Sequence, residues 1–386
     1  RLVDEAAREL GIDRVELRRR NFIPPESFPY KTATGTVYEV ADLPGRLTKA
    51  GAQADWFGLE RRRATTAAKG KLRGIGIAAV IEATAPGNTP RDEILLEAGS
   101  DGTVTAFSAA HSQGQSHETT MAMIVGDALG IAPERVRLRQ AVPEKGLVGN
   151  ASIGSRTMVG AGSVCKIAAD LLIERGRSAA AEEFGIEPSQ VDYAHGIFGE
   201  REGGRSLSLA DLAGKRAIEA KGEGKFGSTW PNGCHISEVE IDPDTGQAEI
   251  VSYVAVDDCG VAINHTIVEG QVQGAVAQGA GQVFGEHIVY DPQSGQLITG
   301  SFMDYVMPRA GLVREIRMDD HPTPSTLSPL GVKGVGESGC TASLGCLANA
   351  VHDALAPLGI GPLEMPLTPS KLWRAIADSR RRPASS

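Results

Sequence analysis

The sequence predicts an α+β protein in which β-hairpins and helices are mixed and form two layered subdomains. Short runs of alternating or continuous apolar residues are joined by glycine- and aspartate-rich turns, which is typical of antiparallel hairpins. Between these runs, apolar residues recur at spacings of three and four, which predicts amphipathic helices. Glycine contributes 47 of the 386 residues without a repeat period. This excess indicates many close approaches between backbone segments.

The overall composition excludes several classes of function. The formal net charge of −9 argues against a nucleic-acid partner, because that affinity depends on clustered lysine and arginine. No apolar run approaches the roughly 20 residues needed to span a bilayer. The five cysteines include no C-x-x-C pair, which disfavours a zinc or iron–sulfur site of common spacing. An odd, scattered count of cysteines fits a reducing compartment, so we expect a cytoplasmic location. The chain opens on Arg1 rather than Met, which leaves periplasmic export open.

The first 73 residues are predicted to be helical with one long loop. Residues 1–22 form a helical pattern that breaks at Gly11, and a polar loop follows from Pro24 to Leu43. A further short helix is expected from Pro44 to Gly51.

Residues 74–200 are predicted to contain a strand, a hairpin and two helices. The strand covers 74–83, and the hairpin pairs 93–98 with 103–109 across a Gly-Ser-Asp-Gly turn. A helix starts after Ser116, which is a plausible N-cap, and stops at Gly130. A strand at 136–139 precedes a long helix from about 159 to 183.

Two polar loops precede those helices. The first, 111–120, carries amide and hydroxyl side chains, and its His117-Glu118 pair is not a zinc-protease motif because position 121 is Met. The second, 149–156, ends in Ser155-Arg156, and the arginine could bind a phosphate or carboxylate or cap a helix. Plain helix capping and ligand binding both remain open for these loops.

Residues 201–386 are predicted to begin near a polar, glycine-rich seam at 186–232. A hairpin of 234–241 and 248–256 leads into a helix from Ile267 to Phe284. A second hairpin is expected from 286–290 and 297–302, and a last helix near 369–379.

The helix at 267–284 combines two unusual stripes. Gln271, Gln278 and Gln282 fall on one arc, and Gly270, Gly274 and Gly281 lie beside them. Glycine costs about 1 kcal/mol relative to alanine inside a helix. We therefore expect this helix to pack closely against a rigid neighbour.

A glycine-dense loop at 331–339 presents one carboxylate, Glu337. A proline-rich run precedes the loop and a helical pattern follows it, so Glu337 should lie at a helix N-terminus, where backbone N–H groups gather. Gly334, Gly336 and Gly339 formally match a dinucleotide fingerprint, but no strand precedes them as that motif requires. A tight turn with a solvated glutamate and a site for an anionic ligand both remain open.

Taken together, these segments resemble one family. The segments are Gly114-Gln115-Ser116-His117-Glu118-Thr119-Thr120, Gly154-Ser155-Arg156, Val256-Asp257-Asp258-Cys259-Gly260 with Asn264, Gly270-Gln271-Val272-Gln273-Gly274, Gly300-Ser301-Phe302-Met303-Asp304-Tyr305 and Gly331-Val332-Lys333-Gly334-Val335-Gly336-Glu337. In order and spacing they are similar to the large, molybdopterin-binding subunit of the xanthine dehydrogenase, aldehyde oxidase and aerobic carbon monoxide dehydrogenase group of molybdenum hydroxylases. The resemblance covers the whole chain but only the C-terminal half of such a subunit.

The resemblance implies a fold of the molybdenum-hydroxylase cofactor-binding type and a division of the chain. Residues 1–73 would continue from a missing first half, 74–200 would form a first molybdopterin-contacting subdomain, and 201–386 a second one with the Glu337 loop. The first half would be a separate chain or a part of the same one. Partners implied are that half, an iron–sulfur subunit and a flavin subunit, in a dimer of heteromers.

The resemblance also implies a cofactor and a set of site residues. The cofactor would be molybdopterin, as the cytosine dinucleotide, with molybdenum held by the pterin dithiolene and not by protein side chains. Iron–sulfur clusters and FAD would lie on partner chains. Glu337 would be the general base. The expected cofactor contacts are Gly114, Gln115, Ser116, His117, Thr119, Gly154, Ser155, Arg156, Cys259, Asn264, Gln271, Lys333, Gly334, Val335 and Gly336.

Two functions follow from these expectations. The first is an oxidoreductase that inserts water-derived oxygen at an electron-poor carbon of an aldehyde or N-heterocycle and passes electrons to its iron–sulfur and flavin partners. The second is a non-catalytic pterin-binding or assembly module that keeps the fold. A carboxylate at position 337 favours the first, and the small-molecule substrate itself is left open.

Overall fold

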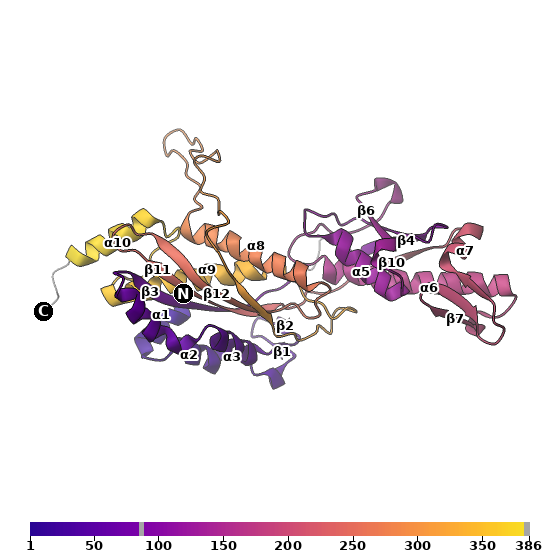
Figure 1. Cartoon of the computed structure of the whole chain (residues 1–386), viewed down its shortest axis with the longest axis horizontal. Coiled ribbons are helices and arrows are strands. Elements are labelled where there is room, and N and C mark those ends of the chain that lie inside the picture. Colours follow the sequence, from indigo (N-terminus) through magenta and orange to yellow (C-terminus); the bar gives the residue numbers. More distant parts are fainter. Residues whose placement is uncertain (85–88, 382–386) are drawn as a thin grey trace.

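The computed structural model describes residues 1–84 and 89–381 of the chain. Two lobes lie side by side along the longest axis of the molecule, and each contains a four-stranded sheet (Figure 1). Helices cover these sheets, so that both lobes are layered. The predicted α+β class with two layered units is confirmed.

The larger lobe is built on a sheet of strand order β13-β12-β11-β3. Its strands are β3 (Leu72–Ile81), β11 (Asn232–Ile241), β12 (Ala248–Asp258) and β13 (Arg317–Asp320). Strands β3, β11 and β12 are antiparallel neighbours, whereas β13 runs parallel to β12. The predicted first strand and the predicted hairpin at 234–256 are therefore confirmed.

Helices cover both faces of this sheet. One face carries α3 (Leu43–Gln53) and α4 (Leu59–Ala67), preceded by α1 (Leu2–Leu10) and α2 (Arg14–Asn21), and the other carries α8 (His265–Phe284) and α9 (Ser338–Leu355). The alternation of β12 explains the two apolar layers. Val254 and Val256 join Leu47 on the α3 side, while Tyr253 joins Val351 on the α9 side.

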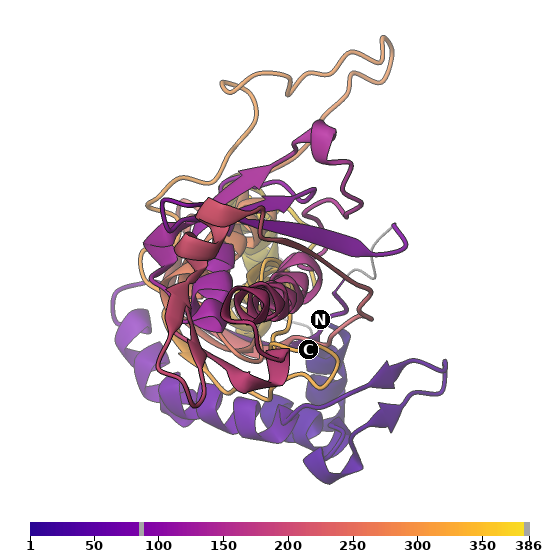
Figure 2. The ribbon, with the colours of Figure 1, turned by 90° about the vertical axis from the view of Figure 1, so that its right-hand side faces the viewer.

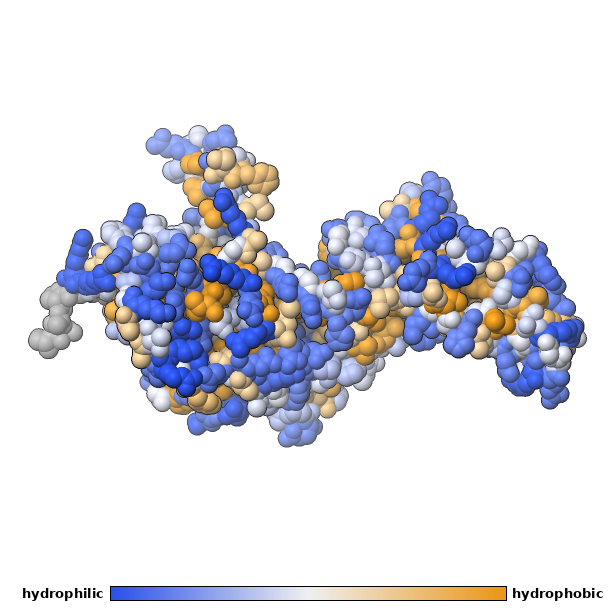
Figure 3. Space-filling view, viewed as in Figure 1, coloured by the Kyte–Doolittle hydropathy of each residue, from blue (hydrophilic) through white to orange (hydrophobic). Residues whose placement is uncertain are grey.

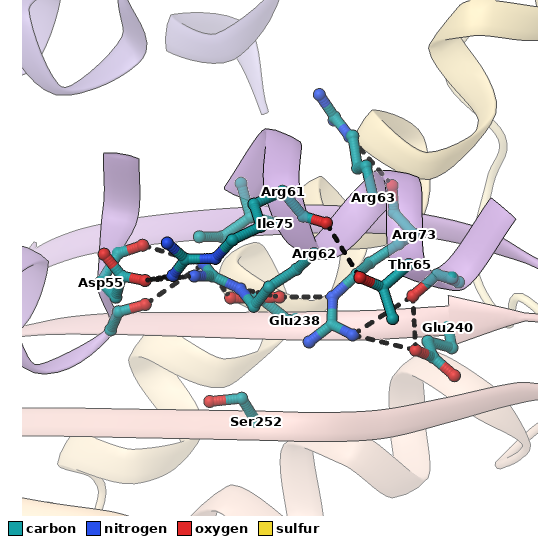
Figure 4. Close-up of polar contacts among 12 residues, drawn as sticks. Asp55, Arg61, Arg62, Arg63, Thr65, Arg73, Ile75, Glu238, Glu240 and Ser252 are labelled. Carbon is teal, nitrogen blue, oxygen red and sulfur yellow. Dashed lines mark hydrogen bonds and ion pairs between the residues drawn. The ribbon is translucent and has the colours of Figure 1, made fainter. Parts of the chain in front are cut away.

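A buried carboxylate fastens α4 to the sheet. Figure 4 shows Arg62 of α4 and Arg73 of β3 reaching Glu238 of β11 from two directions. Arg62 Nη2 lies 2.6 Å from Glu238 Oε1, and Arg73 Nε lies 2.6 Å from Glu238 Oε2. Arg62 also pairs with Asp55, and Arg73 with Glu240. The charges of the two arginines are thus shared among three carboxylates in the partly buried layer.

The smaller lobe has a sheet of order β10-β4-β5-β6. Its elements are β4 (Asp92–Ala98), β5 (Val104–Ser108), α5 (His117–Leu129), β6 (Val136–Gln140), α6 (Ser163–Phe184) and β10 (Glu219–Gly224). Strands β4 and β5 form the predicted hairpin, and α5 is the crossover between the parallel strands β5 and β6. A small sheet of β7 (Val191–Ala194), β8 (Ile197–Glu200) and β9 (Ser206–Ser208), with α7 (Leu209–Lys215), lies at the far end (Figure 1).

The strand β10 bears on the division of the chain. It lies beyond residue 200 and pairs with β4 along its whole length. The chain then crosses to the larger lobe, where β11 begins at Asn232. We therefore propose that the division between the two cofactor-contacting subdomains falls after Gly224 instead of at residue 200.

Of three local expectations, two are confirmed in part and one was wrong. Ser116 is the N-cap of α5 as predicted, but its φ of 63° is left-handed and its side chain makes no capping bond. On α8, Gly270 and Gly274 face open space, whereas an added Cβ on Gly281 would lie 3.0 Å from Pro308 Cδ, and one on Gly279 would lie 1.9 Å from Ser343 Oγ. The hairpin expected at 286–302 has its aspartate turn but no strands, only a bridge between Tyr290 and Leu297.

The failed hairpin is part of a long arm, residues 286–316, which leaves the body after α8 and returns before β13. The arm projects on the side of the larger lobe opposite to the N-terminal helices (Figures 1 and 2). Figure 3 shows apolar surface on this arm. Two of its apolar residues, Phe302 and Met303, are 86% and 92% exposed. Without a packed face on either side, these apolar residues gain nothing from pairing as strands. The last predicted helix is confirmed as α10 (Pro369–Arg381).

Candidate functional site

The site is organised by Glu337, which lies at the N-cap position of α9. The preceding loop is glycine-rich and follows a proline-containing segment, so it reaches α9 without forming a strand. The side chain of Glu337 is exposed and accepts no bond from its own helix. A carboxylate is therefore presented at the surface, with its direction set by a different part of the chain.

Ser155 sets that direction. Its hydroxyl donates a hydrogen bond to Glu337 Oε2 at 2.8 Å and accepts one from the Glu337 backbone nitrogen at 3.0 Å. Ser155 itself has a left-handed φ of 56°. This backbone conformation is uncommon for a residue with a side chain, and such strain often marks a functional loop.

The two loops touch at small residues. A Cβ on Gly334 would lie 2.4 Å from Thr84 Cγ2 and 2.8 Å from Ser155 Cβ, so only glycine allows this approach. The Cβ position of Gly336 lies 3.4 Å from both Gln271 Oε1 and Ser155 Oγ. The structure thus brings together the predicted residues Ser155, Gln271, Gly334 and Gly336 around Glu337.

The first polar loop joins the same cluster through Ser152. Gln115 Nε2 donates to Ser152 Oγ at 2.6 Å, and His117 Nε2 lies 3.4 Å from the same hydroxyl. His117 is buried, and burial lowers its pKa, which favours the neutral ring. The segment 149–157 therefore connects Gln115 and His117 on one side with Glu337 on the other.

The backbone at the end of β12 contacts the Glu337 loop. Lys333 N donates to Cys259 O at 2.7 Å, and Gly260 pairs with Val332 in a short bridge. Cys259 is buried, and burial raises the pKa of its thiol to about 12. The thiol is therefore protonated and apolar, and Cys259 contributes its backbone to the site.

The side chain of Asn264 caps a helix. Its Oδ1 accepts from Ile267 N at 3.1 Å and so caps α8, while Nδ2 contacts Met123 Sδ at 3.5 Å. The side chain thereby connects the start of α8 to α5 of the other lobe.

Two predicted cationic contacts point elsewhere. Arg156 is buried against Asp92, with Nη2 2.8 Å from Asp92 Oδ2. A phosphate, a carboxylate and a helix end were the possible partners of Arg156, and its partner here is a carboxylate of the protein itself. Lys333 Nζ lies 2.7 Å from Asp258 Oδ2, and both side chains are 0% exposed. Burial lowers the pKa of Lys333 despite the opposite charge of Asp258. Neither cation faces Glu337.

The remaining predicted residues differ in exposure. Gly114 and Thr119 are exposed, Ser116 and Gly154 are partly exposed, and Val335 is partly buried. Gly114, Ser116 and Gly154 all have positive φ angles, which turn the backbone of both polar loops.

Sequence analysis missed Glu82, Thr84, Ser152 and Thr341, which also lie at the site. Glu82 and Thr84 follow β3. The position of Glu82, a carboxylate near the end of a predicted strand, could have marked it as a candidate site residue. Ser152 and Thr341 carried no such signal, because serine and threonine are common in loops and helix starts.

Two features are absent from the part of the chain that the structure describes. No group of three or more histidine, cysteine, aspartate or glutamate side chains within 1–84 and 89–381 could hold a metal ion. In the same residues, no helix is long and apolar enough to cross a bilayer.

Polar loops from both lobes and one glutamine-bearing helix thus converge on the oriented carboxylate of Glu337, which defines an α+β cofactor-binding protein. The molybdopterin cofactor-binding domain family matches residues 49–313, more than half of the chain. The chain therefore belongs to this family of molybdopterin-binding proteins, as the resemblance implied.

The chain is also similar to subunits of two bacterial enzymes. The large subunit of nicotine 6-hydroxylase from Paenarthrobacter nicotinovorans is 34% identical over 97% of this chain and 48% of its own length. The large chain of carbon monoxide dehydrogenase from Hydrogenophaga pseudoflava is 30% identical over 98% of this chain and 50% of its own. The chain therefore spans about half the length of these relatives.

Solved structures agree with the fold. Quinoline 2-oxidoreductase from Pseudomonas putida 86 superimposes with a TM-score of 0.89 at 31% identity, over 99% of this chain and 51% of that one. The Cu,Mo-containing carbon monoxide dehydrogenase also gives a TM-score of 0.89, at 29% identity, over 98% of this chain and 51% of that one.

Proposed function

We propose that this chain is the C-terminal, molybdopterin-binding half of an oxidoreductase subunit, and that Glu337 is its general base. The reaction would insert water-derived oxygen at an electron-poor carbon of an aldehyde or N-heterocycle. The observation that carries the proposal is the double hydrogen bond of Ser155 to Glu337, which fixes an exposed carboxylate in one direction. A merely solvated glutamate needs no such support.

The residues present fit the cofactor. Glycine at 336 leaves room between Gln271 Oε1 and Ser155 Oγ that a larger side chain would fill. Gln115, Gln271 and Ser155 offer neutral donors and acceptors, which suit the edge of a pterin better than charged groups do. We propose that these three side chains, with the backbone of Gly114, Gly154, Val335 and Gly336, hold the molybdopterin.

The buried cations have a narrower role in this proposal. Arg156 and Lys333 each neutralise a carboxylate of the protein, so their side chains stabilise the two loops instead of binding phosphate. Lys333, Gly334, Cys259 and Asn264 would then shape the site through the backbone and helix start that they hold.

When bound, the cofactor supplies the oxygen-transfer and redox chemistry. The protein contributes proton removal at Glu337, whose Oε2 is engaged by Ser155 and whose Oε1 is therefore the atom that accepts the proton. His117 and Ser152 keep the neighbouring loop in place. The exposed side of Glu337 is the side from which substrate would approach.

The names of two relatives support an N-heterocyclic substrate. The nicotine hydroxylase and quinoline oxidoreductase subunits are 34% and 31% identical to this chain. We therefore propose an aromatic N-heterocycle as the first candidate substrate, and an aldehyde as the second.

Partners follow from the same relatives. Several are named as large subunits or as subunits of a complex. We propose that this chain works with a first half, an iron–sulfur subunit and an FAD subunit, as a dimer of such heteromers. We also propose that it binds the cytosine dinucleotide form of the cofactor.

The five cysteines are all free thiols, which supports a cytoplasmic location.

The exposed apolar arm supports a contact with the missing first half. Its large apolar residues are exposed in this chain, and a patch of that kind usually marks an interface.

The test is Glu337→Gln in the molybdenum-loaded complex, with Glu219→Gln, an exposed residue of β10, as the control. We expect the variant to keep its molybdenum, measured by metal analysis, and to lose dye reduction with an N-heterocycle or aldehyde. Loss by a factor of 10² or more is expected for a general base. An active Glu337→Gln enzyme contradicts the assigned role. Molybdenum without turnover in the unaltered complex favours the non-catalytic pterin-binding or assembly module instead.

A further inference from the structure

A second carboxyl group lies beside Glu337. Glu82 directly follows β3, and its backbone nitrogen donates to Pro231 O at 2.9 Å. Thr341 Oγ1, in the first turn of α9, lies 3.1 Å from Glu82 Oε2 and 3.0 Å from the Glu337 carbonyl oxygen. One hydroxyl therefore links the end of a strand in the central sheet to the residue that carries the candidate base.

The carboxyl group of Glu82 lies close to Glu337. Glu82 is partly buried, and the Thr341 hydroxyl joins its Oε2 to the backbone of Glu337. Ionised carboxylates on such neighbouring residues repel each other. Burial, together with Glu337, raises the pKa of Glu82, although the Thr341 hydroxyl opposes this. As the pH falls, Glu82 thus takes up a proton earlier than an ordinary glutamate does.

Two further acidic groups lie near this pair, Cys340 and Glu286. The pKa of the Cys340 thiol is raised by burial first, and then by Glu337, Glu82 and Glu286. Glu286 lies beside α8, where its Cδ is 3.1 Å from the Cβ position of Gly281. Each ionised neighbour therefore adds negative charge around the pair.

We propose that Glu82 is a positioning residue for Glu337, donating a hydrogen bond to its carboxylate when protonated and repelling it when ionised. This inference rests on the proposed role of Glu337 as the base. Ser155 holds Oε2 of Glu337 from one side, and Glu82 then governs the charge that the carboxylate faces from the other. Removing the charge of Glu82 should remove this repulsion.

Cys340 provides a test that needs neither cofactor nor turnover. It is the cysteine that is partly exposed, whereas the other four are buried. Alkylation by iodoacetamide follows the thiolate, so its rate at pH 8 reports the negative charge nearby. We expect Glu82→Gln and Glu337→Gln each to raise the alkylation rate about threefold, which corresponds to about half a pKa unit.

Controls make this test specific. Glu219→Gln, which removes a distant exposed charge, should leave the rate unchanged, and Cys340→Ser should abolish the modification. If Glu82→Gln fails to fold, Glu82→Asp, which withdraws the carboxylate by one methylene, should give a smaller acceleration. An unchanged rate in the folded Glu82 variant, with acceleration in Glu337→Gln, overturns the inference.

The second test is the pH profile of kcat/KM in the molybdenum-loaded complex. Glu82→Gln keeps a hydrogen-bond donor but has no charge, so the acidic limb should move to lower pH by about half a unit while KM changes little. A structural role alone would lower activity without moving the limb. If Glu337→Gln is inactive but the acidic limb of the Glu82→Gln profile stays at its original pH, the inference about Glu82 is wrong and the proposed function stands. If Glu337→Gln is active, the proposed function fails.

Discussion

The hydroxyl of Ser155 holds Glu337 at two points, its carboxylate at 2.8 Å and its backbone nitrogen at 3.0 Å, although 182 residues separate them in the chain. The hydroxyl donates its single proton to the carboxylate and uses a lone pair for the amide. Both bonds are needed to fix the loop and the side chain together. The orientation of the candidate base is thus controlled from the smaller lobe, while its helix belongs to the larger one.

Removing this hydroxyl should impair the reaction without unfolding the protein. A hydrogen bond to a charged group contributes about 1.5–3 kcal/mol. We therefore expect Ser155→Ala to lower kcat by about 10- to 100-fold, measured by dye reduction in the loaded complex. Because Ser155 has a left-handed backbone, Ser155→Gly serves as the matched variant that relieves strain. Equal losses in both variants assign the effect to the hydroxyl, whereas activity retained by Ser155→Gly contradicts it.

Gly334→Ala should displace the same loop. Its Cβ would lie 2.4 Å from Thr84 Cγ2 and 2.8 Å from the carbonyl oxygen of Ser155. The loop must move away, which typically costs about 1–3 kcal/mol of unfolding free energy. We expect a lower urea midpoint and reduced molybdenum content in the purified complex. Gly199→Ala, where an added Cβ meets nothing within 4 Å, is the control. Full molybdenum content in Gly334→Ala would show that the loop tolerates the methyl group.

The sequence predicted the loops of the site better than the partners of its charged side chains. Glu337 could be singled out because glycines leave it unshielded, and the helix after it has a clear period. Arg156 and Lys333 have the right type and position for an anionic ligand, yet both are buried against Asp92 and Asp258. Those carboxylates lie 64 and 75 residues away in the chain, and no local pattern marks such pairs.

The hairpin in the arm was predicted wrongly for a similar reason, because its outcome depends on residues outside the segment. Alternating residues and an Asp-Pro-Gln-Ser-Gly turn predict a hairpin, and the turn does form. Strand pairing, however, needs a surface to pack against, which the sequence of the segment itself cannot supply. The residues of α8 illustrate the same point, since the helix period singled out Gly270, Gly274 and Gly281 but not Gly279, which meets Ser343 of α9.

The Glu238 cluster should dominate the attachment of α4 to the sheet. The side chain of Glu238 is 3% exposed and contacts both Arg62 and Arg73. Glu238→Ala leaves two arginines in a partly buried layer, although each keeps a second carboxylate. We expect a loss of about 3 kcal/mol in unfolding free energy, at the low end for a broken buried pair.

Urea unfolding followed by circular dichroism measures this loss. Glu60→Ala is the control, because Glu60 is 79% exposed and pairs with Arg63 on the surface, so its removal should change stability by less than about 0.5 kcal/mol. Similar losses in the two variants would mean that burial of Glu238 is unimportant.

The pair of Asp92 and Arg156 should give the protein a distinct response to acid. Burial raises the pKa of Asp92, but the charge and hydrogen bonds of Arg156, with those of Asn150, outweigh it and hold the pKa below its ordinary value. The folded state therefore binds the Asp92 proton less readily than the unfolded state does. The stabilisation is present in full above the unfolded pKa of about 4 and is lost as the pH falls through the folded value.

Asp92→Asn should accordingly be less stable than the unaltered protein at pH 7, by about 3 kcal/mol for a broken buried pair. The difference between the two should shrink as the pH falls below about 4, because Asp92 of the unfolded chain then binds a proton first and that of the folded protein follows at lower pH. Urea unfolding at a series of pH values measures both effects. Asp170→Asn, which removes the exposed partner of Lys166, should show neither, since exposed pairs contribute little. A difference that stays constant into the acid range would mean that Asp92 stabilises the loop by shape and hydrogen bonding and not by its charge.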